Sequence, residues 1–140
     1  MKSISISEYL CHFIGAPYIW GGDGSGKTHR GFDCSGFVLE GLVAFGLYNG
    51  PDITAQGLYD HLTKTALWKE GNVDHANDGD LLFFGKSTSK ITHVAVALGD
   101  GLMLESGGGG SSCKTAATST GFVRIRPIRK DVVACVYLKK

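Results

Sequence analysis

The sequence predicts an α+β fold, with helices in the N-terminal half and an antiparallel sheet in the C-terminal half. Two observations carry this prediction. Apolar residues recur at helical spacing before about residue 68, and from Asp80 onward short apolar runs have the two-residue period of strands. At 140 residues the chain is large enough for one hydrophobic core, so we treat 1–140 as a single domain.

Three segments of the first half have helical spacing. One lies within residues 4–14, behind serines that are able to cap it. The second begins at Cys34, directly after a glycine-rich loop, and the third covers residues 53–68 with Thr54 as its cap. A polar connection is expected over 69–79.

Five strands are expected in the second half, over residues 81–84, 92–98, 102–105, 122–128 and 132–138. The strand over 92–98 alternates clearly between its two faces, and one face carries His93 among alanines. Because that face is otherwise small, we expect it to pack against the helix that begins at Cys34. The imidazole would then point at the N-terminus of that helix.

The charge balance excludes some classes of partner. With 14 basic and 13 acidic residues the net charge is +1, which gives no electrostatic reason to expect nucleic acid or another acidic polymer. The first residues lack a long apolar segment and a cleavage site, so we expect no signal peptide, no membrane insertion and synthesis in the cytoplasm.

Cys34 is the candidate nucleophile. The positive end of a helix dipole favours a thiolate in the first turn, and a histidine such as His93 is the usual base for it. The alternatives are a buried apolar cysteine and a core histidine. The other cysteines, Cys11, Cys113 and Cys135, form no Cys-x-x-Cys pair, and we expect them to be reduced thiols.

A phosphate-binding loop is the competing interpretation of the glycine-rich segment. The spacing from Gly21 to Gly26-Lys27-Thr28 matches the P-loop pattern formally. However, no βαβ unit precedes it and no helical pattern follows Thr28 directly, so we do not expect a nucleotide site.

Two motifs in the same order resemble those of the NlpC/P60 cysteine peptidases. They are Pro17–Gly22 with Gly31–Val38, which contains Asp-Cys-Ser-Gly, and Gly79–Phe84 with His93–Gly101. Members of this family are papain-like enzymes that cut bacterial cell-wall stem peptides. The resemblance implies a papain-like NlpC/P60 fold, with N-terminal helices packed on a C-terminal antiparallel sheet, and a thiol peptidase that needs no metal or cofactor.

The resemblance also implies site residues. Cys34 would be the nucleophile and His93 the base, and Tyr18 would help the backbone amide of Cys34 to stabilise the oxyanion. Asp33 and Ser35 would hold the free N-terminus of the stem peptide. With Trp20, they form the predicted substrate-binding set.

Glu105 is the candidate for the residue that orients the histidine. In the family this position follows on the next strand and is most often a second histidine, so a glutamate is a departure. A two-residue loop at Asp100–Gly101 would turn Glu105 to the opposite face from His93, whereas a three-residue loop over 99–101 places it on the same face. We predict the three-residue loop; the alternative is an exposed strand glutamate.

The function implied by the resemblance is hydrolysis of the bond between D-glutamate and the diamino acid of a murein stem peptide. The segments Glu105–Gly110 and Val123–Arg129 look like phage-borne members, with a phage tail or a holin system as partner and the bacterial cell wall as the place of action. Two alternatives stay open: an amidase or acyltransferase on the same fold, and a catalytically silent virion or assembly protein.

Overall fold

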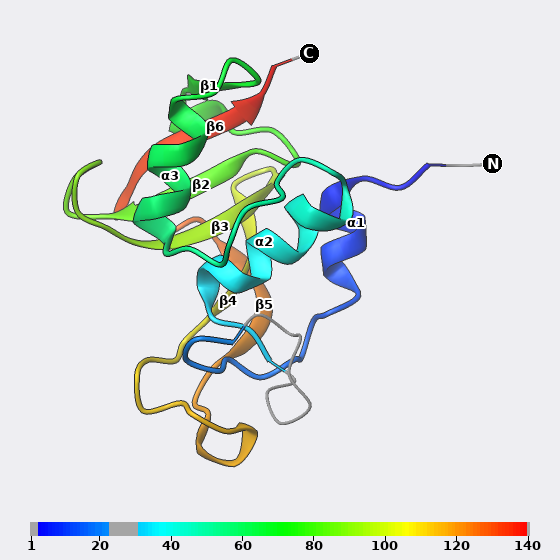
Figure 1. The fold of residues 1–140 in the computed structure, drawn as a ribbon, viewed down its shortest axis with the longest axis vertical. Coiled ribbons are helices and arrows are strands. Elements are labelled where there is room, and N and C mark those ends of the chain that lie inside the picture. The colour runs from blue at the N-terminus through cyan, green and yellow to red at the C-terminus, as the bar shows by residue number, and fades with distance from the viewer. Residues whose placement is uncertain (1–2, 23–30, 140) are drawn as a thin grey trace.

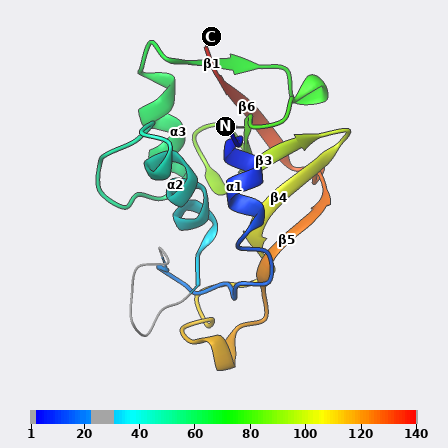
Figure 2. The same ribbon diagram turned by 90° about the vertical axis from the view of Figure 1, so that its right-hand side faces the viewer.

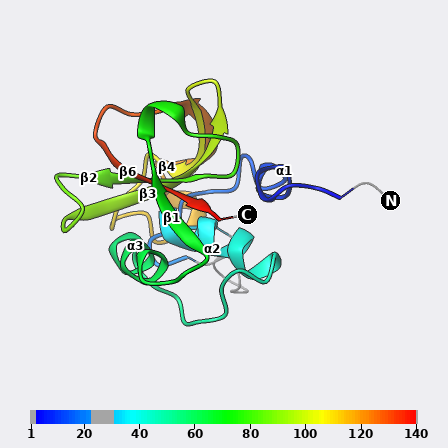
Figure 3. The ribbon, with the colours of Figure 1, turned by 90° about the horizontal axis from the view of Figure 1, so that it is seen from above.

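The computed structural model describes residues 3–22 and 31–139 (Figure 1). Its six strands form one antiparallel sheet in the order β1-β6-β2-β3-β4-β5. Viewed from above, α2 and α3 lie together on one side of this sheet (Figure 3). The predicted α+β class and arrangement are therefore confirmed. Within the described residues, no helix combines the length and apolar character that a membrane span requires.

Side-chain caps begin each helix. Helix α1 covers Ile6–Cys11, α2 covers Cys34–Ala44 and α3 covers Ala55–Thr63 (Figure 2). The oxygens of Ser5, Asp33 and Thr54 accept hydrogen bonds from amides of the respective first turns, which have no acceptor inside the helix. Short 3₁₀ turns lie at Val73–His75 and Ala116–Thr118.

The strands follow the predicted order, with one addition. Their bounds are β1 Trp68–Gly71, β2 Leu81–Gly85, β3 Ile91–Gly99, β4 Leu102–Gly107, β5 Phe122–Pro127 and β6 Val132–Leu138. The helix predicted over 53–68 is too long, because α3 ends at Thr63 and β1 begins at Trp68. Trp68 is buried, but the other three residues of β1 and Leu67 before it are exposed, so burial does not alternate along this strand. Four-residue β1 carries too few positions for its pattern to be recognised in sequence.

The main core lies between the helices and one face of the sheet. It contains Val94 and Val96 of β3 together with Phe37, Val38 and Leu42 of α2. The opposite face of β3 belongs to a smaller cluster with Ala95, Ala97, Leu82, Phe84, Met103 and Cys135. The prediction that the His93 face packs on the Cys34 helix is therefore wrong, because the larger side chains gain more from burial against the helices.

The β3–β4 hairpin decides where Glu105 points. Val96 pairs with Leu104, and continuing this register places Glu105 on the face of the histidine, as predicted. The predicted loop is wrong, however. Asp100 and Gly101 alone form the turn, with φ of 56° and 76°, and a bulge at the end of β3 supplies the extra residue.

A close backbone approach at Gly121 leads to a stability prediction. A Cβ built there would lie 2.2 Å from the carbonyl oxygen of Gly107 and 2.6 Å from backbone atoms of the next two residues. We expect Gly121→Ala to lower the free energy of unfolding by about 1–3 kcal/mol, since the backbone must shift to admit a methyl group. Gly110→Ala is the matched control, because a Cβ added there would have no atom within 4 Å. Equal melting temperatures for the two variants would contradict this packing.

Candidate active site

Cys34 occupies the first position of α2. Asp33 caps the helix, with Oδ1 accepting a hydrogen bond from the Gly36 amide at 2.7 Å, and the Ser35 hydroxyl lies 3.4 Å from the same oxygen. Burial raises the pKa of the Asp33 carboxyl, and the Gly36 amide opposes this rise. The half-buried Cys34 side chain is thus fixed at the positive end of a capped helix.

His93 on β3 faces the thiol. The sulfur of Cys34 lies 4.0 Å from the carbonyl oxygen of Thr92, the residue before the histidine. The pairing of β3 with β4 ends at Val96 and Leu104, whereas β4 stays paired with β5 through Gly107. His93 therefore lies beyond the paired part of the two strands, where its ring can interact with the thiol although the helices pack on the other face.

Glu105 on β4 binds the ring of His93. Its Oε1 lies 2.6 Å from His93 Nε2, and its side chain is fully buried. The second oxygen, Oε2, accepts a hydrogen bond from Arg124 Nε at 2.9 Å and lies 3.8 Å from a terminal nitrogen of Arg126. Because Nε2 is engaged by Glu105, the ring presents its other nitrogen to Cys34.

Electrostatics stabilise a protonated histidine in this arrangement. Burial lowers the pKa of His93, but the hydrogen bonds to Cys34 and Glu105 and their charges outweigh it and raise the pKa to about 9. For Glu105, burial raises the pKa, but the hydrogen bonds to His93 and Arg124 and their charges outweigh burial, so the net change is a decrease. At neutral pH the carboxylate is therefore charged while the imidazole is protonated.

Tyr18 lies beside the thiol. Its ring is buried and lines the same cleft as Cys34. Burial raises the pKa of the phenol, and negative charge on Cys34, Asp33 and Cys113 adds to the effect. The hydroxyl therefore keeps its proton and is able to donate a hydrogen bond at neutral and alkaline pH.

A cleft of about 760 Å³ opens in front of Cys34. It brings together the predicted substrate-binding residues Asp33, Ser35 and Trp20, and the indole is 55% exposed. The other lining residues come from the α2–α3 connection, the start of α3, the start of β3 and the segment before α2, namely Asp52, Ile53, Thr54, Ala55, Gly57, Ile91, Thr92, Tyr18 and Gly21.

Two residues around this site do not follow from the sequence analysis. Arg124 is paired with Glu105 across β4 and β5, and the alternating Val-Arg-Ile-Arg pattern of β5 is the available signal. For Gln56, the helical pattern alone favours a place on the surface. Its side chain instead accepts from the Ile91 amide at 2.7 Å and donates to the Thr88 carbonyl at 2.9 Å, and so holds α3 to the start of β3.

The structure gives no support for the other kinds of site that the sequence suggests. The P-loop pattern falls largely on residues 23–30, outside the described residues. Cys11, Cys113 and Cys135 are free thiols in the structure. Over residues 3–22 and 31–139, no three histidine, cysteine or acidic side chains gather as a metal site.

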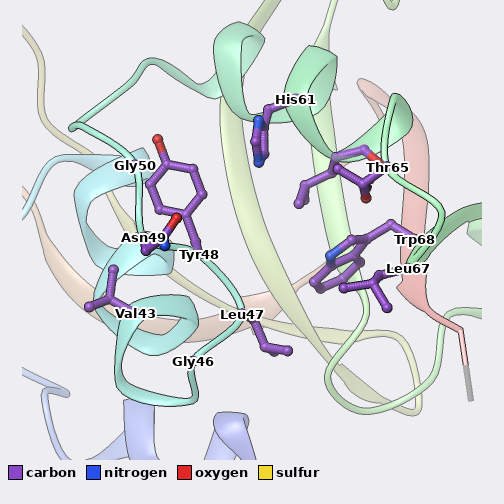
Figure 4. A pocket seen from close by; sticks show the side chains of 11 residues that line it. Val43, Gly46, Leu47, Tyr48, Asn49, Gly50, His61, Thr65, Leu67 and Trp68 are labelled. Atoms are coloured by element: carbon purple, nitrogen blue, oxygen red, sulfur yellow. Dashed lines mark hydrogen bonds between the residues drawn. The ribbon is translucent and has the colours of Figure 1, made fainter.

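A second hollow of about 690 Å³ lies between the end of α2 and α3 (Figure 4). The rings of Tyr48 and His61 meet edge to face across it, with centroids 5.2 Å apart, and Trp68 closes one end. None of the described residues that line it is a cysteine or a carboxylate, whereas Cys34 and Asp33 line the first cleft.

Comparison with known proteins agrees with the motifs. The family model described as NlpC/P60 family matches residues 15–129. A gamma-D-glutamyl-L-lysine dipeptidyl-peptidase of Bacillus cereus is 36% identical over 96 residues, covering 67% of this chain and 25% of that protein. Peptidoglycan endopeptidase RipB of Mycobacterium tuberculosis is 31% identical over 130 residues, covering 84% of this chain and 44% of that protein. The chain thus spans less than half the length of these relatives.

Solved structures show the same fold. The peptidoglycan hydrolase RipB from Mycobacterium tuberculosis superposes with a TM-score of 0.67 at 26% identity, covering 96% of this chain and 64% of that one. RipD from the same organism has a TM-score of 0.65 at 22% identity and covers 98% of both chains; it is described as a non-catalytic domain that has adapted to peptidoglycan binding. Since the family model covers most of the chain, this protein belongs to the NlpC/P60 family.

Proposed function

We propose that this protein is a cysteine endopeptidase that hydrolyses peptidoglycan stem peptides. The observation that carries the proposal is the series Cys34–His93–Glu105, with a half-buried thiol beside an open cleft and a buried histidine and glutamate behind it. Relatives named as peptidoglycan endopeptidases support the substrate class. A non-catalytic member of similar fold exists, so the proposal depends on these side chains and not on the fold alone.

The geometry supports acyl transfer through a thioester. The Cys34 sulfur attacks the carbonyl carbon, and the carbonyl electron pair moves to oxygen, where the Cys34 amide and the Tyr18 hydroxyl would donate. Protonated His93 gives its proton to the leaving nitrogen as the C–N bond breaks. Neutral His93 then takes a proton from water, whose oxygen attacks the thioester and releases the sulfur.

The bond between D-glutamate and the diamino acid is the proposed point of cleavage. The support is the name of the Bacillus cereus relative, which specifies a gamma-D-glutamyl bond to L-lysine. Asp33 and Ser35 line the cleft next to Cys34 and are suited to bind the ammonium group of a free stem N-terminus. Trp20 offers an exposed aromatic face on the same wall.

Mass spectrometry of digested, purified peptidoglycan tests the reaction. We expect fragments cut between D-glutamate and the diamino acid, and one ¹⁸O atom in the new carboxyl group when the reaction runs in labelled water. Fragments cut at the sugar–peptide amide would identify an amidase. Transfer of the acyl group to an added amine, with no ¹⁸O in the product, would identify an acyltransferase. No product together with no preferential iodoacetamide labelling of Cys34 would favour a silent structural protein.

The biological setting that we propose is a bacteriophage, acting on the bacterial wall in lysis or at a virion tail. Its support is the likeness of Glu105–Gly110 and Val123–Arg129 to phage-borne members. Co-expression with a holin should lower culture turbidity, whereas a Cys34→Ala variant should not. Intact cultures despite activity on isolated peptidoglycan would contradict the lysis role.

A further inference from the structure

Arg124 on β5 binds the oxygen of Glu105 that His93 leaves free. The arginine and the glutamate are paired directly across β4 and β5, and Arg124 Nε donates to Glu105 Oε2 at 2.9 Å. The other oxygen, Oε1, lies 2.6 Å from His93 Nε2. Any rotation of the carboxylate away from the imidazole would therefore break a charge-assisted hydrogen bond to the neighbouring strand.

The surroundings of this ion pair hold both side chains in place. Gly107 ends β4, and a Cβ built on it would lie 2.6 Å from Oε2 of Glu105; a Cβ built on Gly108 would lie 3.1 Å from a terminal nitrogen of Arg124. The guanidinium carbon of Arg124 lies 5.9 Å from the centre of the Phe122 ring on the same strand. The arginine side chain is 28% exposed and the glutamate side chain is fully buried. The two glycines thus leave the space that the carboxylate and the guanidinium group fill.

A carboxylate as buried as that of Glu105 needs a cationic partner to stay ionised. His93 is such a partner only while its ring is protonated, and in the proposed mechanism the ring gives its proton to the leaving nitrogen. Arg124 keeps its charge at every step, because a guanidinium group does not lose its proton in proteins. The other titratable or charged groups near this pair are Cys34 on α2, Arg126 on β5, and Arg129 with Asp131 in the β5–β6 connection.

We propose that Arg124 is a positioning residue that keeps Glu105 ionised and turned toward His93 throughout the reaction. The inference rests on the proposed peptidase function and adds a fourth residue behind Cys34, His93 and Glu105. The described residues that line the Cys34 cleft do not include Arg124, so its effect on the reaction passes through Glu105. Without Arg124 the carboxylate would take up a proton or turn away from the ring, and either change leaves less imidazolium at neutral pH.

The titration of the His93 ring tests this role without any substrate. In Arg124→Met, NMR of the ring should show the loss of the imidazolium proton at a pH lower by about one unit or more than in the wild type. Alkylation of Cys34 by iodoacetamide at pH 7 should be slower, because less imidazolium is present to stabilise the thiolate. Arg124→Lys keeps the charge and should restore most of the wild-type midpoint. Arg124→Gln, which keeps a donor without the charge, should show the same shift as Arg124→Met, and it replaces that variant if the latter does not fold.

An unchanged or higher midpoint in Arg124→Met would overturn the proposal. If Glu105 stayed ionised and in place, the loss of a nearby positive charge would raise the pKa of the ring. Arg126→Met is the matched comparison on the same strand. Arg126 lies 3.8 Å from Oε2, too far for a hydrogen bond, so its removal should not lower the midpoint. An equal decrease in both variants would also overturn the assignment to Arg124. Lys69→Met is the charge-matched control, because this exposed residue lies in β1 at the opposite edge of the sheet.

A double-mutant cycle shows whether Arg124 acts through Glu105. We expect Arg124→Met to lower kcat for stem-peptide hydrolysis by about tenfold or more and to leave KM within about threefold. Added to Glu105→Gln, the same change should lower kcat by no more than about a further threefold. Losses that multiply would overturn the proposal. A lower ring midpoint in Arg124→Met without cleavage by the wild type would support the role of Arg124 and refute the peptidase, whereas cleavage with an unchanged midpoint would refute this inference alone.

Discussion

Replacing Cys34 with alanine should abolish stem-peptide hydrolysis and leave the fold intact. The sulfur is the only protein atom in the proposed mechanism that bonds to the carbonyl carbon of the substrate, so we expect a loss of about 10⁴-fold or more in kcat. The side chain is only half buried and caps no helix, since Asp33 performs that role. The melting temperature should therefore change by no more than a few degrees. Release of stem fragments at the wild-type rate would exclude Cys34 as the nucleophile.

His93→Ala should be as inactive, and the double variant no worse. Thiol and imidazole act as one unit, so removing the second group costs little once the first is absent. Cys113→Ala is the matched control for Cys34, because it removes another free thiol that lies near Tyr18 but outside the proposed mechanism. The rate of hydrolysis and the labelling of Cys34 by iodoacetamide are the two measurements. A double variant much slower than either single one would mean that the two residues act independently.

The sequence predicted the place of Cys34 at the start of a helix because the signals there are local. Asp33 is a strong N-cap, and the apolar helical pattern starts immediately after it, so the start of α2 at Cys34 follows from a few neighbouring residues. The face of Glu105 was also predictable from strand alternation and hairpin register. The type of the turn was not predictable, because a two-residue turn with a bulge and a three-residue loop give the same pairing of β3 with β4.

Features that depend on distant parts of the chain were not predictable. Strand β1 exists because Trp68 pairs with Leu138 at the other end of the chain. The side of the sheet that the helices cover depends on how much each face gains from burial. Arg124 is opposite Glu105 only through the β4–β5 pairing, whose long connection prevents a register from being assigned from sequence. These are non-local pairings, and a single sequence carries little information on them.

Glu105→Gln should reduce catalysis without unfolding the protein. Glutamine keeps the size of the side chain and an acceptor oxygen for His93, but it removes the charge that stabilises the imidazolium and pairs with Arg124. We expect kcat/KM to fall by roughly ten- to a thousandfold, less than on removal of the nucleophile or base. Glu40→Gln is the control, because it removes a carboxylate that binds Tyr9 between α1 and α2. Wild-type activity in Glu105→Gln would mean that another group orients the ring.

The dependence of kcat/KM on pH should also change in the Glu105→Gln variant. Protonated His93 must donate to the leaving nitrogen, so wild-type kcat/KM should fall as the pH rises through about 9, the raised pKa of this histidine. In Glu105→Gln one source of the increase is absent while burial still lowers the pKa, so the alkaline limb should move to lower pH. The free energy of unfolding should depend on the same protonation of His93. Because the folded pKa of about 9 exceeds the ordinary 6.5, stabilisation is complete below 6.5 and is lost as the pH rises toward 9. The variant should lose less stability over that window. An alkaline limb at the same pH in both proteins would show that Glu105 does not stabilise the protonated ring.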